Sequence, residues 1–387
     1  MRVRASPIAE SPAHVVYNRL ENLPGASMHI PDGYLSPSTC AALYAAAGLG
    51  WYSALRRIRR TMTTRMVPLI SVFAAFSFVL MMFNLPLPGG TTGHAIGVTI
   101  AVIVIGPAGA IMAISIAIAI QALFFGDGGI TTLGANCFNM AIVGSLVAFA
   151  VYRLVASRAA ITSRRRMVAA ALAGYFATNA AALVTAVEFG IQPMLFHDAR
   201  GVPLYAPYSL GIAIPAMMIG HLTIAGGAEA VISAGLVAYL QVADPALLQR
   251  TSGLLPDGAS AHPQAPQKSL RRLWITVALL LLLTPLGVLT AGTAWGEWSA
   301  SEFSHAEGRS RIAANSQSQT IPLETPVGLQ RLSRFWTAPV PDYAPQFVKS
   351  RSLGYALSGM FGVGLVMSLS LALQSYLRRR HGTGLAA

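Results

Sequence analysis

The chain has 387 residues, of which 54% are hydrophobic and only 11% are charged. Soluble globular proteins contain roughly 45–50% apolar and about 25% charged residues, so this composition excludes an ordinary water-soluble enzyme. The 27 Lys and Arg residues outnumber the 14 Asp and Glu residues. This excess does not indicate a nucleic-acid partner, because the basic residues fall in short loops between apolar segments rather than on one face of a folded domain.

In chain order, residues 1–27 come first and contain no apolar stretch of signal-peptide length, so they are predicted to be an N-terminal appendage. Apolar runs of membrane-crossing length then predict a polytopic transmembrane, all-α bundle in contact with lipid. The predicted spans are 38–55, 66–84, 94–105, 107–124, 134–155, 167–187, 208–240, 273–291 and 353–377. The Gly106-Pro107 break between the short third and fourth spans favours a compressed hairpin over two full crossings.

A segment rich in Pro, Ser, Ala and Gly at 250–270 is typical of a flexible linker. It separates a domain of about seven helices at 28–249 from a unit at 271–387, in which two spans flank an extracytoplasmic segment of about 60 residues. Arg and Lys cluster after alternate spans, and the positive-inside rule places those loops in the cytoplasm. The segments expected to face outward are 28–37, 85–93, 125–133 and 292–352.

The lysines and cysteines limit the kinds of site that the chain can contain. Neither lysine of the chain, Lys268 or Lys349, completes G-x-x-x-x-G-K-[ST], so the chain has no phosphate-binding loop of its own. If the chain pumps a substrate, the energy comes from elsewhere. Cys40 and Cys137 lie in apolar spans and are interpreted as small buried hydrophobic residues rather than as a disulfide or a metal pair.

His29 would be chemically special if Met28 were the first residue of the chain. The free amine of Met28, the amide nitrogen of His29 and the His29 imidazole would then form fused five- and six-membered chelate rings in one plane. One further imidazole would complete a square-planar set of four nitrogens, a geometry diagnostic of Ni(II) or Cu(II). His94 is the best fourth donor, since it is expected on the same side of the membrane. The alternative is a histidine at the membrane interface with no ligand.

Other polar residues beside or within spans also mark candidate sites, because such residues are expensive in a membrane. The G-D-G-G loop around Asp127 is either an oxygen or anion site or a tight turn between two spans. His221 and Glu229 are eight residues apart in one span and either share a site or face the bundle interior without a ligand.

Three motifs in this order carry a family resemblance: M-H-I-P-D-G-Y-L-S-P, G-G-T-T-G-H and L-F-F-G-D-G-G-I-T-T-L-G-A-N-C-F-N-M. They resemble the CbiM/NikM family, the substrate-specific membrane components of energy-coupling factor (ECF) transporters for cobalt and nickel. The resemblance covers about residues 28–245. The motifs at 284–298 and 329–343 are similar to the N-component extension fused to many such proteins.

The resemblance implies a ligand set in this sequence. Met28 would supply its amine, His29 its amide and imidazole nitrogens, and His94 the fourth nitrogen. Asp32 and Asp127 would hold the N-terminal segment in place from a second layer of contacts. Because a peptide bond at Met28 would remove the amine donor, we expect the working protein to start at Met28, without residues 1–27.

The resemblance also implies the activity: uptake of Ni²⁺ or Co²⁺ across the bacterial cytoplasmic membrane, with the metal site facing outward. The metal would be a transported substrate, and no prosthetic group is expected. A transmembrane coupling subunit and a pair of ATPase subunits would be the partners. Nickel is favoured because a planar nitrogen set suits Ni(II), whereas cobalt would connect the chain to cobalamin biosynthesis. The alternatives are a membrane-embedded metal-dependent hydrolase, for which no H-E-x-x-H motif occurs, and a channel-like bundle without metal.

Overall fold

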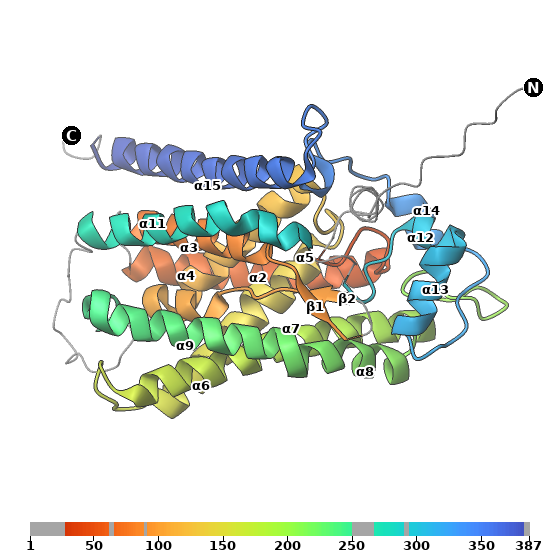
Figure 1. Ribbon diagram of the computed structural model, residues 1–387, viewed down its shortest axis with the longest axis horizontal. Coiled ribbons are helices and arrows are strands. Elements are labelled where there is room, and N and C mark those ends of the chain that lie inside the picture. Colours follow the sequence, from red (N-terminus) through yellow and green to blue (C-terminus); the bar gives the residue numbers. More distant parts are fainter. Residues whose placement is uncertain (1–27, 62–65, 89–90, 250–266, 290–293, 383–387) are drawn as a thin grey trace, which may run out of the picture.

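The computed structural model describes residues 28–61, 66–88, 91–249, 267–289 and 294–382. Residues 1–27 and most of the expected linker lie outside this described part. The long helices run side by side along one axis of the molecule, and the short helices α12 to α14 gather at one end (Figure 1). The prediction of an all-α membrane bundle is confirmed by this arrangement.

The first unit consists of helices joined by one small hairpin. Its elements are α2 (Pro37–Thr61), α3 (Met66–Met81), β1 (Leu85–Leu87), β2 (Thr91–Gly93), α4 (Val98–Ile120), α5 (Leu133–Asn136), α6 (Gly144–Ala156), α7 (Arg164–Leu195), α8 (Leu210–Gly220), α9 (Gly226–Ala243) and α10 (Pro245–Gln249). Three π-helical turns extend or join these helices: η1 (Gln121–Phe125), η2 (Cys137–Val143) and η3 (His221–Ala225). Because π-helical turns are rare and occur frequently at functional sites, these turns indicate where in the bundle such a site lies.

The chain reverses direction within α4. Gly106 has φ 76° and ψ 167°, outside the helical region, and Pro107 follows it. Just before α4, His94 lies against Met28, and just after η1, Asp127 accepts a hydrogen bond from the same residue. A straight helix through α4 and η1 would hold its ends about 42 Å apart. The break at Gly106 therefore makes the hairpin that the sequence favours, and it brings both arms to one site.

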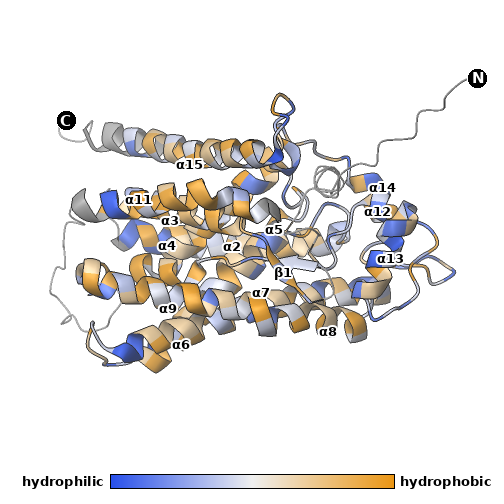
Figure 2. Cartoon of the chain, in the orientation of Figure 1, coloured by the Kyte–Doolittle hydropathy of each residue, from blue (hydrophilic) through white to orange (hydrophobic). Residues whose placement is uncertain are grey.

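Among the described residues, six helical stretches meet the length and apolar composition of a membrane span, although the first of them contains the reversal at Gly106: Val98–Phe125, Leu133–Ala156, Arg164–Leu195, Leu210–Ala243, Leu270–Gly287 and Arg351–Ala372. Helix α3 is apolar but has only 16 residues. The span expected at 38–55 does form helix α2, yet α2 is not apolar enough to be among these six stretches. Figure 2 shows hydrophobic residues along the middle of the helices and hydrophilic residues gathered toward their ends.

The second unit comprises α11 (Gln267–Leu283), η4 (Thr284–Leu289), α12 (Ala300–Ser304), α13 (Ala306–Asn315), α14 (Val327–Leu332), η5 (Pro341–Tyr343) and α15 (Arg351–Gly382). Helix α11 already begins at Gln267, so the linker expected to reach residue 270 ends earlier. Helices α11 and α15 pack on α3 (Figure 1), and the Tyr355 hydroxyl donates to the carbonyl of Met82 at 2.8 Å. The segment between them folds over the end of the first unit, where Val340 N donates to Phe124 O at 2.9 Å.

Candidate metal centre

The irregular segment 28–36 is buried at this end of the bundle, clamped by the turn that follows η1. Asn136 accepts a hydrogen bond from Ile30 N at 3.0 Å and donates one to Ile30 O at 3.2 Å, so one amide side chain holds both polar groups of that residue. Gly129 N adds a backbone bond to Ile30 O at 2.9 Å. His29 is 1% exposed and Met28 6%. The start of the segment is thus fixed beneath the surface.

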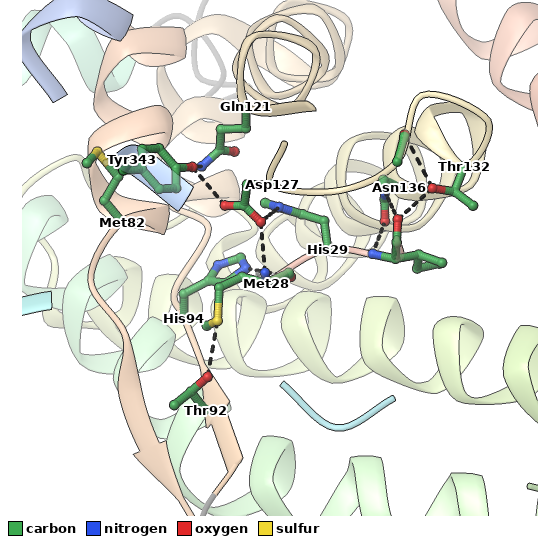
Figure 3. Close-up of polar contacts among 12 residues, drawn as sticks. Met28, His29, Met82, Thr92, His94, Gln121, Asp127, Thr132, Asn136 and Tyr343 are labelled. Carbon is green, nitrogen blue, oxygen red and sulfur yellow. Dashed lines mark hydrogen bonds and ion pairs between the residues drawn. The ribbon is translucent and has the colours of Figure 1, made fainter. Parts of the chain in front are cut away.

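Asp127 gathers three donors on one carboxyl group (Figure 3). Its Oδ1 accepts from Met28 N at 2.8 Å and contacts His29 Nδ1 at 2.9 Å, so these two nitrogens converge on one point. Its Oδ2 accepts from the Tyr343 hydroxyl at 2.7 Å, and Gln121 donates to that hydroxyl at 3.0 Å. Burial alone would raise the pKa of Asp127, but the His29 ring and these hydrogen bonds lower it. The carboxylate form is favoured.

Two glycines allow this close approach. A Cβ on Gly128, where φ is +90°, would lie 2.8 Å from the Cβ of His29. A Cβ on Gly129 would lie 2.4 Å from both the backbone nitrogen and a carboxyl oxygen of Asp32. Such contacts are far shorter than van der Waals distances, so only glycine fits there. The G-D-G-G run is therefore more than a turn between two helices: its missing side chains make room for segment 28–36.

Asp32 ties the same loop down from the other side. Its Oδ1 accepts from Thr131 N at 2.7 Å and from the Thr131 hydroxyl at 2.5 Å, while Oδ2 accepts from Ile130 N at 3.1 Å. Asp32 and Asp127 therefore reach across between segment 28–36 and loop 126–132 in opposite directions. Neither contact depends on a metal, so the two segments are locked together by the protein itself.

His94 enters the site from β2. The strand pairs antiparallel with β1, Leu85 facing Gly93, and ends directly before His94. His94 Nδ1 lies 3.2 Å from the carbonyl of Ala95, and Nε2 lies 3.4 Å from the carbonyl of Met28. Burial, and then the nearby His29 ring, lowers the pKa of His94 to about 4, so the ring is neutral at pH 7. A neutral ring has one N–H, and the tautomer that directs it from Nδ1 to the Ala95 carbonyl would leave the lone pair of Nε2 for a ligand.

The three predicted ligand residues are thus brought together from segments 66 positions apart. The rings of His29 and His94 have centroids 5.2 Å apart, and Nε2 of His29 is buried without a hydrogen-bond partner among the described residues. Within the described ranges, no group of three or more His, Cys, Asp or Glu side chains is placed to hold a metal ion.

Glu229, left open by the sequence, has a structural role. It is fully buried on α9, and its Oε2 accepts from Ile96 N at 2.7 Å and from Gly97 N at 3.0 Å. It therefore holds the backbone between His94 and the start of α4. His221 instead has its Nδ1 2.9 Å from Met217 O, within its own helix. Cys40 and Cys137 are buried and free, as expected of small apolar residues.

Sequence reasoning missed the contribution of Tyr343 and Asn136. Both residues fall inside the motifs named above: Asn136 ends the L-G-A-N run, and Tyr343 is the last residue of 329–343, which ends in P-V-P-D-Y. Nothing in their spacing predicts that Tyr343 reaches a carboxyl 216 positions away. The Tyr343 ring is stacked on Phe125, with centroids 4.6 Å apart and an interplanar angle of 16°. The second unit therefore takes part in building the site of the first.

Comparison with known proteins agrees with this arrangement. The family model described as the cobalt uptake substrate-specific transmembrane region, CbiM, matches residues 29–247, and the PDGLE domain matches residues 270–379. Two crystal structures described as transition metal transporters, one of them truncated, superpose with a TM-score of 0.52. They are 49% and 50% identical in sequence, and each covers 55% of this chain. The superposition spans 98% of the truncated transporter and 92% of the other.

Relatives span both units. The fused nickel transport protein NikMN of Rhodobacter capsulatus is 53% identical over 355 residues, covering 91% of this chain and 99% of the relative. The probable fused nickel transport protein LarMN of Lactiplantibacillus plantarum is 38% identical over 90% of this chain and 98% of the relative. The cobalt transport protein CbiM of Geobacter sulfurreducens is 31% identical over 68% of this chain and 73% of the relative. These relatives are transport proteins, which argues against the hydrolase alternative. The chain belongs to the CbiM family of metal transport proteins, with a PDGLE domain fused after the membrane domain.

Proposed function

We propose that this chain is the metal-binding subunit of an ATP-driven ECF transporter and that it binds Ni²⁺, or alternatively Co²⁺, through four nitrogens. The donors are the Met28 amine, the His29 amide and imidazole nitrogens, and the His94 imidazole. The observation that carries the proposal is the convergence of Met28 N and His29 Nδ1 on one point, at 2.8 and 2.9 Å from Asp127 Oδ1, beside a neutral His94 ring.

The amine donor requires a chain that starts at Met28, and this is part of the proposal. Two observations support it: segment 28–36 is already clamped by Asn136 and Asp32, and the family model begins at residue 29. Metal binding then displaces protons from the donor nitrogens. The Asp127 carboxylate stays beside the site as a hydrogen-bond acceptor for the amine, which orients the donor and offsets the charge of the ion.

Nickel is favoured because a planar four-nitrogen set suits Ni(II), and the affinity order of such sites also places Ni²⁺ above Co²⁺. The names of the relatives above support both metals. Transport crosses the cytoplasmic membrane with segment 28–36 facing outward, and the clusters of Arg after alternate spans support this orientation. Release requires a transmembrane coupling subunit and a pair of ATPase subunits.

Spectroscopy of the full chain purified from its native host, together with N-terminal sequencing, tests the site. We expect a mature chain beginning at Met28 and a nickel-loaded protein with the absorption and X-ray spectra of planar nitrogen ligation. His94→Ala should lose the planar species, whereas His197→Ala, an exposed histidine in the loop after α7, should keep it. A mature chain beginning at Met1, or octahedral oxygen-rich ligation, would overturn the proposal.

The dependence on partners has its own test. In cells that co-express the coupling and ATPase subunits, depletion of ATP should stop nickel uptake while the purified chain still binds nickel. Uptake that continues without ATP would contradict the ECF assignment and leave the nitrogen site unaffected.

A further inference from the structure

A hollow of about 350 Å³ lies between the two units, beside the candidate metal centre. Its wall in the first unit is the glycine loop that carries Asp127, together with Pro31 and Asp32. Its wall in the second unit is segment 297–302 with Trp336 and Asp342. The loop that separates this hollow from His29 is therefore the same loop that positions the nitrogens. Anything held in the hollow is a short distance from the site.

Four carboxyl groups line the hollow, and two of them are already committed. Asp32 holds loop 126–132, as described above, and Glu302 caps its own helix, accepting from Ser299 N at 2.8 Å. The remaining two are Glu297 and Asp342. Within the described ranges, neither carboxyl group forms a hydrogen bond or an ion pair with the first unit.

Glu297 has a buried carboxyl group with an unpartnered oxygen. It is only 8% exposed, it lines the hollow, and its Oε2 has no hydrogen-bond partner among the described residues. It appears in none of the ion pairs formed within the described ranges. Its charged neighbour is Asp127, which repels it, while Asp342 has both Asp127 and Arg351 as charged neighbours. A buried carboxyl oxygen without a donor is costly. A positively charged ligand would satisfy it by displacing the proton that the buried Glu297 otherwise keeps.

The size of the hollow favours a hydrated ion over a bare one. Each water occupies about 30 Å³ in the liquid, so an ion with six waters needs roughly 180 Å³, which fits within the available space. Carboxylate oxygens bind divalent cations weakly, either directly or through the water molecules of the hydrated ion. The four-nitrogen set requires an ion that has lost its water. The two sites therefore differ in chemistry as well as in position.

We propose that this hollow is an outer cation site, in which Glu297 and Asp342 hold a hydrated divalent metal ion before it passes Asp127 to the nitrogen donors. This inference rests on the proposed function for the direction of transfer. It assigns the second unit a direct part in capturing the metal, because both carboxylates come from that unit. Clefts lined by one sign of charge raise the local concentration of the opposite ion and its association rate by about 10- to 1,000-fold.

Loading kinetics test the outer site. The purified chain that begins at Met28, in lipid nanodiscs, is mixed with Ni²⁺ at low ionic strength, and formation of the planar nickel band is followed by stopped-flow absorbance. We expect the double variant Glu297→Gln with Asp342→Asn to load at least 10-fold more slowly than the wild type, with a weaker dependence on salt, and to reach the same final spectrum. The matched control is Glu307→Gln with Glu324→Gln, which removes the same charge from exposed positions of the same segment.

Equal loading rates in the double variant and the control would overturn the outer site. A wild-type chain that never forms the planar band would instead count against the proposed function, and a second measurement covers that case. Electron paramagnetic resonance with Mn²⁺ as the probe, in the His94→Ala background, should detect one weakly bound ion that is lost on Glu297→Gln and kept in the control variant. Mn²⁺ binding that is unaffected by Glu297→Gln would also overturn the inference.

Discussion

Asp127 and Glu297 are both buried carboxyl groups at the same end of the molecule, but they differ in their hydrogen bonding and in the direction of their pKa shifts. Asp127 accepts hydrogen bonds from Met28, His29 and Tyr343, and these lower its pKa despite its burial. Glu297 has an unpartnered oxygen, and burial followed by repulsion from Asp127 raises its pKa well above the usual range. A carboxyl group whose oxygens all accept hydrogen bonds holds neighbouring segments in place, whereas one with an unpartnered oxygen is available to a ligand.

The largest effect is expected from Asp127→Asn, which breaks the fully hydrogen-bonded half of this comparison. The amide has one acceptor oxygen where the carboxylate has two, and its NH₂ group faces donors. Loss of such an outer partner of a metal ligand costs about 10- to 100-fold in affinity. We expect the upper end of that range for nickel, about 100-fold, because one group serves Met28 and His29 together. Isothermal titration calorimetry measures the affinity.

Asp198→Asn is the control for that experiment, since Asp198 lies in an exposed turn after α7 and pairs with Arg200 at 3.2 Å. Nickel affinity equal to that of the wild type in Asp127→Asn would show that the hydrogen bonds to Met28 and His29 do not prepare the site.

A smaller effect is expected from Tyr343→Phe, which sharpens the comparison by separating the two units. The substitution keeps the stacking on Phe125 and removes only the hydroxyl that donates to Asp127 Oδ2. A hydrogen bond to a charged group contributes about 1.5–3 kcal/mol. Because Met28 and His29 still hold Oδ1, we expect about a 10-fold loss of nickel affinity. Tyr239→Phe, on the exposed face of α9, serves as the control. An unchanged affinity would make Tyr343 a packing residue.

Much of the fold could be predicted because membrane helices are encoded locally. Apolar runs predict the long helices, and the Gly106-Pro107 break favours the reversal, since proline removes a helical hydrogen bond and glycine admits the required φ. The span at 38–55 was the weak case, because α2 is long enough but not apolar enough.

The candidate site could be predicted in part, and for a different reason. His29 and His94 stand out because polar residues beside apolar spans are rare, and the chelate argument follows from covalent geometry alone. Contacts such as Tyr343 with Asp127 depend on how two units dock over more than 200 positions. No local periodicity encodes such a contact. The same holds for Glu297: its motif is visible in the sequence, whereas its missing partner is a property of the folded chain.

The smallest expected effect comes from Glu297→Gln on stability, and its sign separates the two carboxyls most clearly. Because the folded-state pKa of Glu297 is raised, the folded chain keeps a proton that the unfolded chain releases above its usual range near pH 4.3. The contribution of Glu297 to the free energy of unfolding is therefore fully present at low pH and is lost as pH rises toward the folded-state pKa. Glu297→Gln removes this loss, so the metal-free variant should be more stable than the wild type at pH 7, by about 1 kcal/mol, and equal to it at pH 4. Asp127→Asn should be less stable at pH 7. Thermal melts of metal-free protein at the two pH values measure both variants, and a Glu297→Gln variant that melts below the wild type at pH 7 would mean that Glu297 already has a partner in the folded protein.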